Sequence, residues 1–174
     1  MLILNSCKIK KDKNKKRKIL IATSCGYANH ISGKNYSKRM TKNAYGNNLI
    51  ESEIINLEKE VSLDEQIFDF WKDFIPEVAM KLPNDEIVVR PHPSEDKVFW
   101  FKYLKKYKNI RINSNKSINN ELVNSDAFIH FNSTSAIASR IFCIPTFMLL
   151  PDIDNRFFDR ITYVKDLSIN IKSA

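Results

Sequence analysis

The stretch EIVVRPHPSE, residues 86–95, decides which fold the sequence predicts. Its apolar run is typical of a strand that is covered on both faces, and the segment that follows has the pattern of a helix. Pro91 and Pro93 flank His92. Because the residue before a proline is disfavoured in the helical region, we expect His92 to be extended, with its imidazole held in one direction. We call residues 90–95 the His-Pro corner and take it as a candidate site, because α/β proteins bind ligands where strands end.

Strands and helices alternate on both sides of this corner. The alternation with short connections predicts right-handed crossovers and a parallel sheet covered by helices on both faces, that is, a Rossmann-like three-layer α/β fold. All strands of such a sheet end at the same edge. The expected strands are residues 19–23, 86–90, 110–112, 127–131 and 146–150, and the expected helices are residues 62–82, 94–106, 118–123 and 136–142.

Local motifs predict where these helices begin. Ser62 and Glu65 fit a capping box, so a helix should start there. Pro76 lies inside its pattern and should kink or split it. Residues 31–50 are polar and weakly periodic, and we expect a long irregular loop. After the His-Pro corner, Ser94 should cap the next helix, with Glu95 and Asp96 in its first turn.

Positive charge is concentrated near the N-terminus. Eight basic residues and one acid lie between Lys8 and Lys18; this segment carries +7 of the formal net charge of +8 and leaves 20 basic and 19 acidic residues elsewhere. Residues 1–17 are therefore predicted to be a basic tail or linker, and residues 18–174 a single Rossmann-like domain. A nucleic-acid partner is disfavoured, since the body is nearly neutral. The tail is solvated in one interpretation; in the other, residues 8–18 associate weakly with anionic lipid headgroups.

Cysteine usage and hydropathy bear on the compartment. Cys7, Cys25 and Cys143 are an odd number at unrelated spacings, which fits neither a disulfide framework nor a zinc site. We expect Cys25 and Cys143 to be small apolar fillers, and no metal is implied. No run of about 18 apolar residues occurs. We therefore expect a cytoplasmic protein, with peripheral association at the inner face of the cell membrane as the alternative.

A second candidate site lies about 40 residues after the first. The segment Asn132-Ser133-Thr134-Ser135 follows a predicted strand and opens a helix, so its hydroxyls and backbone amides suit a phosphate. Arg90 and His92 could add donors from the same edge of the sheet. Taken singly, each has a plain structural explanation: a helix cap, a surface ion pair, a bond to backbone. Taken together they favour an anion site. We expect His130, which lies mid-strand, to be a core residue.

Two stretches carry a resemblance to a known family. Residues 87–95, IVVRPHPSE, and residues 125–136, SDAFIHFNSTSA, followed by Ile144-Pro145, resemble the C-terminal, donor-binding lobe of GT-B type bacterial glycosyltransferases of surface and capsule polysaccharide biosynthesis. CDP-glycerol glycerophosphotransferases are more distantly similar. They share a His-Pro corner paired with a later hydroxyl-rich helix start. The similar part covers roughly residues 86–151.

This resemblance implies a nucleotide-activated sugar as the substrate, with no cofactor. His92 and the hydroxyls or amides of Ser133, Thr134 and Ser135 would hold the donor's phosphates, and His92 would act on the leaving group. In this family the acceptor's base usually belongs to an N-terminal lobe, which we expect this chain to lack; that lobe or a second subunit would be a partner. The alternatives are a non-catalytic nucleotide- or anion-binding module, a truncated inactive remnant, or a basic-tailed adaptor at nucleic acid or membrane.

Overall fold

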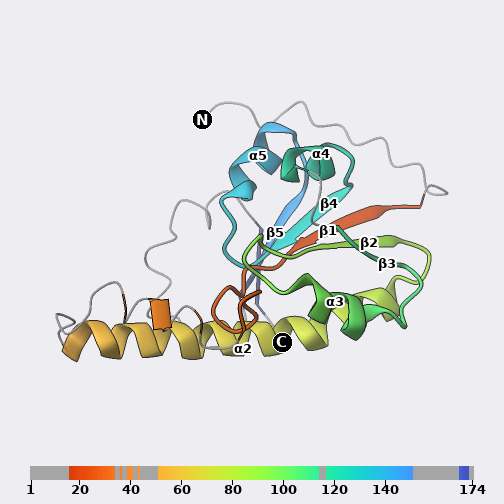
Figure 1. Ribbon diagram of the computed structural model, residues 1–174. Helices are drawn as coiled ribbons and strands as arrows, with labels where there is room; N and C mark the ends of the chain where they lie inside the picture. The colour runs from red at the N-terminus through yellow and green to blue at the C-terminus, as the bar shows by residue number, and fades with distance from the viewer. Residues whose placement is uncertain are drawn as a thin grey trace.

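The computed structural model of the protein describes residues 16–33, 36, 39–40, 43, 51–113, 117–150 and 169–172. Strands and helices alternate through most of this part (Figure 1). The strands are β1 (Lys18–Ala22), β2 (Glu86–Arg90), β3 (Ile110–Ile112), β4 (Ala127–His130), β5 (Thr146–Leu150) and β6 (Ile169–Lys172). The helices are α2 (Glu51–Lys81), α3 (Lys97–Leu104), α4 (Ile118–Val123) and α5 (Ser135–Ile141).

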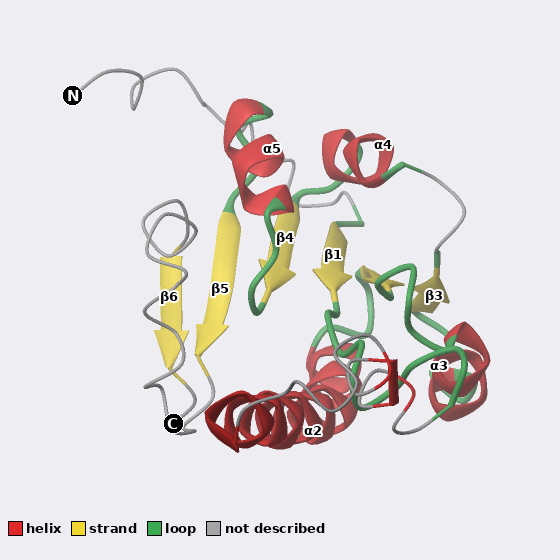
Figure 2. Ribbon diagram, turned by 60° about the vertical axis from the view of Figure 1, so that its left-hand side comes forward, coloured by secondary structure: helices red, strands yellow, loops and turns green. Residues whose placement is uncertain are grey.

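The described strands form a six-stranded sheet in the order β3-β2-β1-β4-β5-β6. Every neighbouring pair is parallel. Helices α2 and α3 lie on one face and α4 and α5 on the other (Figure 2). The prediction of a Rossmann-like three-layer α/β fold is therefore confirmed. Strand β6 was not predicted, because the apolar pattern fades after residue 150.

Two apolar clusters fill the space on either side of the sheet. Because side chains alternate along a strand, Ile19 and Ile21 of β1 face the cluster that contains Trp71 of α2 and Trp100 of α3. Leu20 and its alternate neighbours face the opposite cluster, beneath α4. Both faces of the central strands are thus buried, which explains why their sequences are continuous apolar runs rather than alternating ones.

Helix α2 differs from its prediction at its start and in its middle. It begins at Glu51 and runs for 31 residues through both Ser62 and Pro76. The capping-box prediction is wrong, since Ser62 is an exposed residue of the helix interior. The helix is not split at Pro76 either. The carbonyl that a residue at position 76 would normally bond is that of Lys72, and the hydroxyl of Tyr103 on α3 donates to it at 3.2 Å.

Two further local predictions are wrong. Helix α3 is capped by Asp96, not by Ser94: the Asp96 carboxylate accepts a 2.8 Å hydrogen bond from the amide of Val98. Among residues 31–50, the described positions Tyr36, Arg39, Met40 and Asn43 are helical, so the loop prediction fails there.

The last residue of the predicted tail, Arg17, is bonded to the sheet at the amino-terminal ends of β1 and β2. The carbonyl of Arg17 accepts from the amide of Glu86 at 2.8 Å, and its side chain forms an ion pair with Asp85. This ion pair lowers the pKa of Asp85, chiefly through the hydrogen bond from Arg17. Residues 1–15 lie outside the described residues, so the tail itself stays a prediction. Within the described part of the chain, none of the helices is long and apolar enough to cross a membrane.

The observed helix starts predict effects of different size for two substitutions. Asp96→Ala should lower the free energy of unfolding by about 1 kcal/mol, because it removes an N-cap. Ser62→Ala should change it by less than about 0.5 kcal/mol, because alanine suits an exposed helix interior. Urea unfolding followed by circular dichroism measures both. A larger loss for Ser62→Ala than for Asp96→Ala would restore the capping-box interpretation.

Candidate functional site

The strand order places a topological switch point between β1 and β4. The chain leaves β1 and β2 towards α2 and α3, and it leaves β4 towards α5 on the opposite face (Figure 2). In parallel α/β sheets, ligands bind outside the carboxyl ends of the strands at this point. Ala22 aligns with Arg90 on one side and with His130 on the other. The His-Pro corner and residues 132–135 therefore start at one level, two strand spacings or about 10 Å apart.

His92 is exposed, and its ring orientation is set by Ser94. The Nδ1 atom lies 2.7 Å from the hydroxyl of Ser94, and the amide of Ser94 donates to the same nitrogen at 3.3 Å. An amide can only donate, so Nδ1 acts as an acceptor and the proton of the neutral ring is on Nε2. His92 thus offers an N–H donor at the carboxyl edge of the sheet.

Arg90 is half-buried at the end of β2. Burial lowers its pKa, and the charge of Glu121 acts in the opposite direction. Because Arg90 alternates with Val89, it lies on the α4 face of the sheet rather than on the α2 face. Arg90 therefore has a structural role on that face as the alternative to its predicted role as a hydrogen-bond donor to phosphate.

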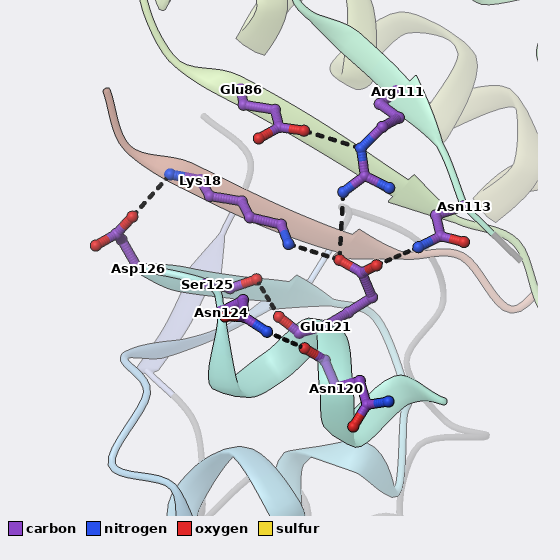
Figure 3. A network of polar contacts seen from close by, with 9 residues as sticks. All are labelled: Lys18, Glu86, Arg111, Asn113, Asn120, Glu121, Asn124, Ser125 and Asp126. Atoms are coloured by element: carbon purple, nitrogen blue, oxygen red, sulfur yellow. Dashed lines mark hydrogen bonds and ion pairs between the residues drawn. The ribbon is translucent and has the colours of Figure 1, made fainter. Parts of the chain in front are cut away.

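Glu121 of α4 forms a polar cluster that the sequence analysis missed (Figure 3). Glu121 is 1% exposed, and its carboxylate lies 2.7 Å from the amine of Lys18 and 3.4 Å from the guanidinium of Arg111. Asn113 donates to it, and Arg111 also bonds Glu86 at 2.9 Å. Burial raises the pKa of Glu121, but these partners outweigh it and the net pKa is lowered. The cluster joins α4 to β1 and β3, and no local sequence pattern signals it.

Residues 132–135 are only partly available to a ligand. The amide of Ser133 donates to Nδ1 of His130 at 3.2 Å, and that of Ser135 donates to the hydroxyl of Ser133 at 3.2 Å. The prediction of unpaired amides is therefore wrong at Ser133 and Ser135. Asn132 and Thr134 are exposed, and Thr134, at the N-cap of α5, makes no capping bond with its side chain to any described residue. The side chains that remain accessible to a ligand are therefore those of Asn132 and Thr134.

His130 is a core residue, as predicted. It is fully buried, stacks on Phe128 with ring centroids 5.1 Å apart, and accepts the amide of Ser133. Burial lowers the pKa of His130 to about 4, so the ring is neutral at physiological pH. A neutral, buried imidazole at the end of β4 therefore holds the segment that carries Thr134 through the bond to the Ser133 amide.

The loop after β1, residues 23–30, was not predicted to belong to the site. It lies next to the His-Pro corner: a Cβ atom on Gly26 would be 3.0 Å from the Ser94 hydroxyl, and the amide of Ile31 bonds the Ser94 carbonyl at 2.8 Å. Gly26 therefore allows the two loops to lie in close contact. Cys25 is buried and burial raises its pKa well above the usual value, which confirms it as a filler. Cys143 is exposed, so the same prediction is wrong there.

Two buried carboxylates hold this loop. Asp64 of α2 accepts the amides of Tyr27 at 2.9 Å and Ala28 at 2.8 Å. Glu95 accepts the hydroxyl of Thr23 at 2.9 Å and the amide of Cys25 at 3.2 Å. Both acids come from segments far from the loop in sequence. The sequence gives no pairing signal for them, because Asp64 reads as part of a capping box and Glu95 as a first-turn charge.

The pKa of Asp64 leads to a pH-dependent prediction. Burial raises the pKa from 3.8 to about 6, against the two amide bonds that lower it. The folded protein therefore binds this proton more tightly than the unfolded chain, and stability should fall as pH rises from about 4 to about 6, by at most about 3 kcal/mol. Asp64→Asn should abolish this part of the pH dependence in urea unfolding between pH 4 and 7, with the exposed Asp69→Asn as the control. Parallel pH profiles for the parent and Asp64→Asn would contradict it.

Among known proteins, one solved structure shows a weak similarity to this chain. No family model matches the sequence. No curated protein matches it. Among solved structures, the glycosyltransferase SnogD from Streptomyces nogalater is similar over 90% of this chain and 32% of SnogD, with a TM-score of 0.45 and 14% sequence identity. The chain thus spans about a third of SnogD's length. At this level of likeness, the match assigns neither a family nor an activity.

Proposed function

We propose that this protein binds the phosphates of a nucleotide-activated sugar at the carboxyl edge of its sheet, as the donor-binding lobe of a glycosyltransferase. One observation carries the proposal. At the switch point, His92 and Thr134 are exposed on two loops that start at the same level of the sheet, and each loop is held from beneath by a buried side chain. Glu95 holds the first loop, and His130 holds the second.

The chemistry of these groups fits a phosphate. The Nε2–H of His92, the hydroxyl of Thr134 and the side-chain amide of Asn132 are donors, and Ser133 and Ser135 add half-buried hydroxyls. In glycosyl transfer the bond from the sugar to the phosphate oxygen breaks, and the electron pair stays on the phosphate. Donors that are already in position stabilise this charge as it develops. No residue of this chain is assigned as the base that takes the acceptor's proton.

The finer parts of the proposal rest on the family resemblance of residues 87–95 and 125–136. They are a role in surface or capsule polysaccharide synthesis, a place in the cytoplasm or at the inner face of the membrane, and a partner lobe or subunit that binds the acceptor. The alternative is a module that binds nucleotides without transferring a sugar.

Nucleotide titration tests the site. Isothermal calorimetry of the full chain with CMP, CDP, UDP and GDP should show binding of at least one nucleoside diphosphate. His92→Ala and Thr134→Val should each weaken it about 10-fold or more, because each removes a hydrogen bond to a charged group. Both losses should be smaller for the monophosphate. Ser62→Ala, an exposed hydroxyl on α2, should leave the affinity unchanged.

Two outcomes would overturn parts of this proposal. If no nucleotide binds, or if both site variants bind as the parent does, the edge is not a phosphate site. If nucleotides bind but the protein, supplied with sugar nucleotides and polysaccharide acceptors, releases no nucleoside diphosphate, the non-catalytic module is favoured.

A further inference from the structure

We propose that Glu95 is a positioning residue of the candidate site: its buried carboxylate joins the loop after β1 to the His-Pro corner, and so fixes the direction of the His92 ring. This inference rests on the proposed function for its consequence in nucleotide binding. The geometry behind it is independent of any ligand.

The Glu95 side chain is completely buried, yet it is surrounded by hydrogen-bond donors. One carboxylate oxygen, Oε1, accepts from the Thr23 hydroxyl at 2.9 Å, the His92 amide at 2.9 Å and the Cys25 amide at 3.2 Å. The other, Oε2, accepts from the Thr23 hydroxyl at 3.0 Å and the indole N–H of Trp100 at 3.0 Å. The two amides and the indole can only donate, so an ionised carboxylate, which only accepts, matches this environment.

These donors come from three separate parts of the fold. Thr23 and Cys25 follow β1, His92 follows β2, and Trp100 belongs to α3. Glu95 therefore ties the loop at the switch point to the corner on the neighbouring strand. Backbone bonds reinforce the junction, among them Asp96 N to Asn29 O at 2.7 Å.

Glu95 also fixes His92 from both sides of its backbone. Its carboxylate accepts the His92 amide, and its own amide donates to the His92 carbonyl at 2.9 Å. With the backbone held in this turn, Ser94 reaches Nδ1 of the imidazole. The placement of the Nε2–H therefore depends on Glu95, although Glu95 cannot itself touch a ligand from its buried position.

The arrangement allows a test by charge removal and rescue. Glu95→Gln replaces one acceptor oxygen with an NH₂ donor. If the remaining oxygen keeps the bonds from Cys25 and His92, the NH₂ group faces the indole N–H of Trp100, and two donors meet. Trp100→Phe removes that N–H. The double variant should therefore recover much of what Glu95→Gln loses, which a simple loss of packing would not do.

The first measurement needs no nucleotide. In the full chain, ¹⁵N-histidine spectra report the tautomer of each ring, with His30 and His130 as internal references, and hydrogen exchange reports the amides of residues 23–30 and 91–95. Glu95→Gln should shift the His92 signals towards a tautomer mixture and speed exchange of the Cys25 and His92 amides at least tenfold. Glu95→Gln/Trp100→Phe should reverse most of this. The matched control is Glu121→Gln, which changes a similarly buried acid of α4 and should leave both readouts unchanged.

The second measurement tests whether the positioning of His92 by Glu95 affects nucleotide binding. Glu95→Gln should weaken nucleoside diphosphate binding about as much as His92→Ala, and should add nothing in the His92→Ala background, because it acts through His92. Unchanged His92 signals in Glu95→Gln, or a full additional loss in that background, would overturn the inference. Should Glu95→Gln fail to fold, Thr23→Val gives the same test with a smaller effect. If the parent binds no nucleotide, the proposed function fails while the ligand-free spectra still decide whether Glu95 positions His92.

Discussion

The buried carboxylate of Glu95 is the interaction on which the carboxyl edge of this sheet depends. An isolated charge in the interior costs several kcal/mol even after the protein relaxes around it. Such a charge persists only where donors replace the lost water, and here the hydroxyl of Thr23, two backbone amides and the Trp100 indole do so. All four donors must be brought together at once. The edge is therefore a cooperative unit, in which the loop after β1 and the His-Pro corner order each other.

A second buried acid, Glu121, joins elements on the other face of the sheet. Glu121 binds Lys18 at the start of β1, whereas Glu95 binds Thr23 just after its end. The central strand is thus fastened at both ends to elements of opposite layers. Between them the strand is wholly apolar, and its side chains belong to the buried clusters on both faces of the sheet.

The sequence predicted what local pattern determines, and missed what distant partners determine. The apolar run of residues 87–89 predicted β2, which spans Glu86–Arg90 as expected, because a strand buried on both faces has a continuous hydrophobic segment. Ser62 led to a wrong helix start, because a serine followed three residues later by glutamate can also occur in the interior of a helix. Asp64 and Glu95 read as helix-start acids, yet each binds amides about 40 to 70 residues away. Alternation placed His92 and Ser133 on one edge, but whether the Ser133 amide was free depended on His130.

The two prolines of the corner explain why the backbone and the ring of His92 are both fixed by hydrogen bonds. Proline has no amide hydrogen, so residues 91–94 offer only the amides of His92 and Ser94 as backbone donors. Both are used on the histidine: its own amide binds Glu95, and the Ser94 amide binds Nδ1. Both backbone donors of residues 91–94 are therefore already paired in the observed turn. A general-base role would require Nε2 to accept a proton, but this arrangement makes Nδ1 the acceptor and leaves Nε2 as the donor. The local chemistry of the corner thus favours holding an anion over abstracting a proton.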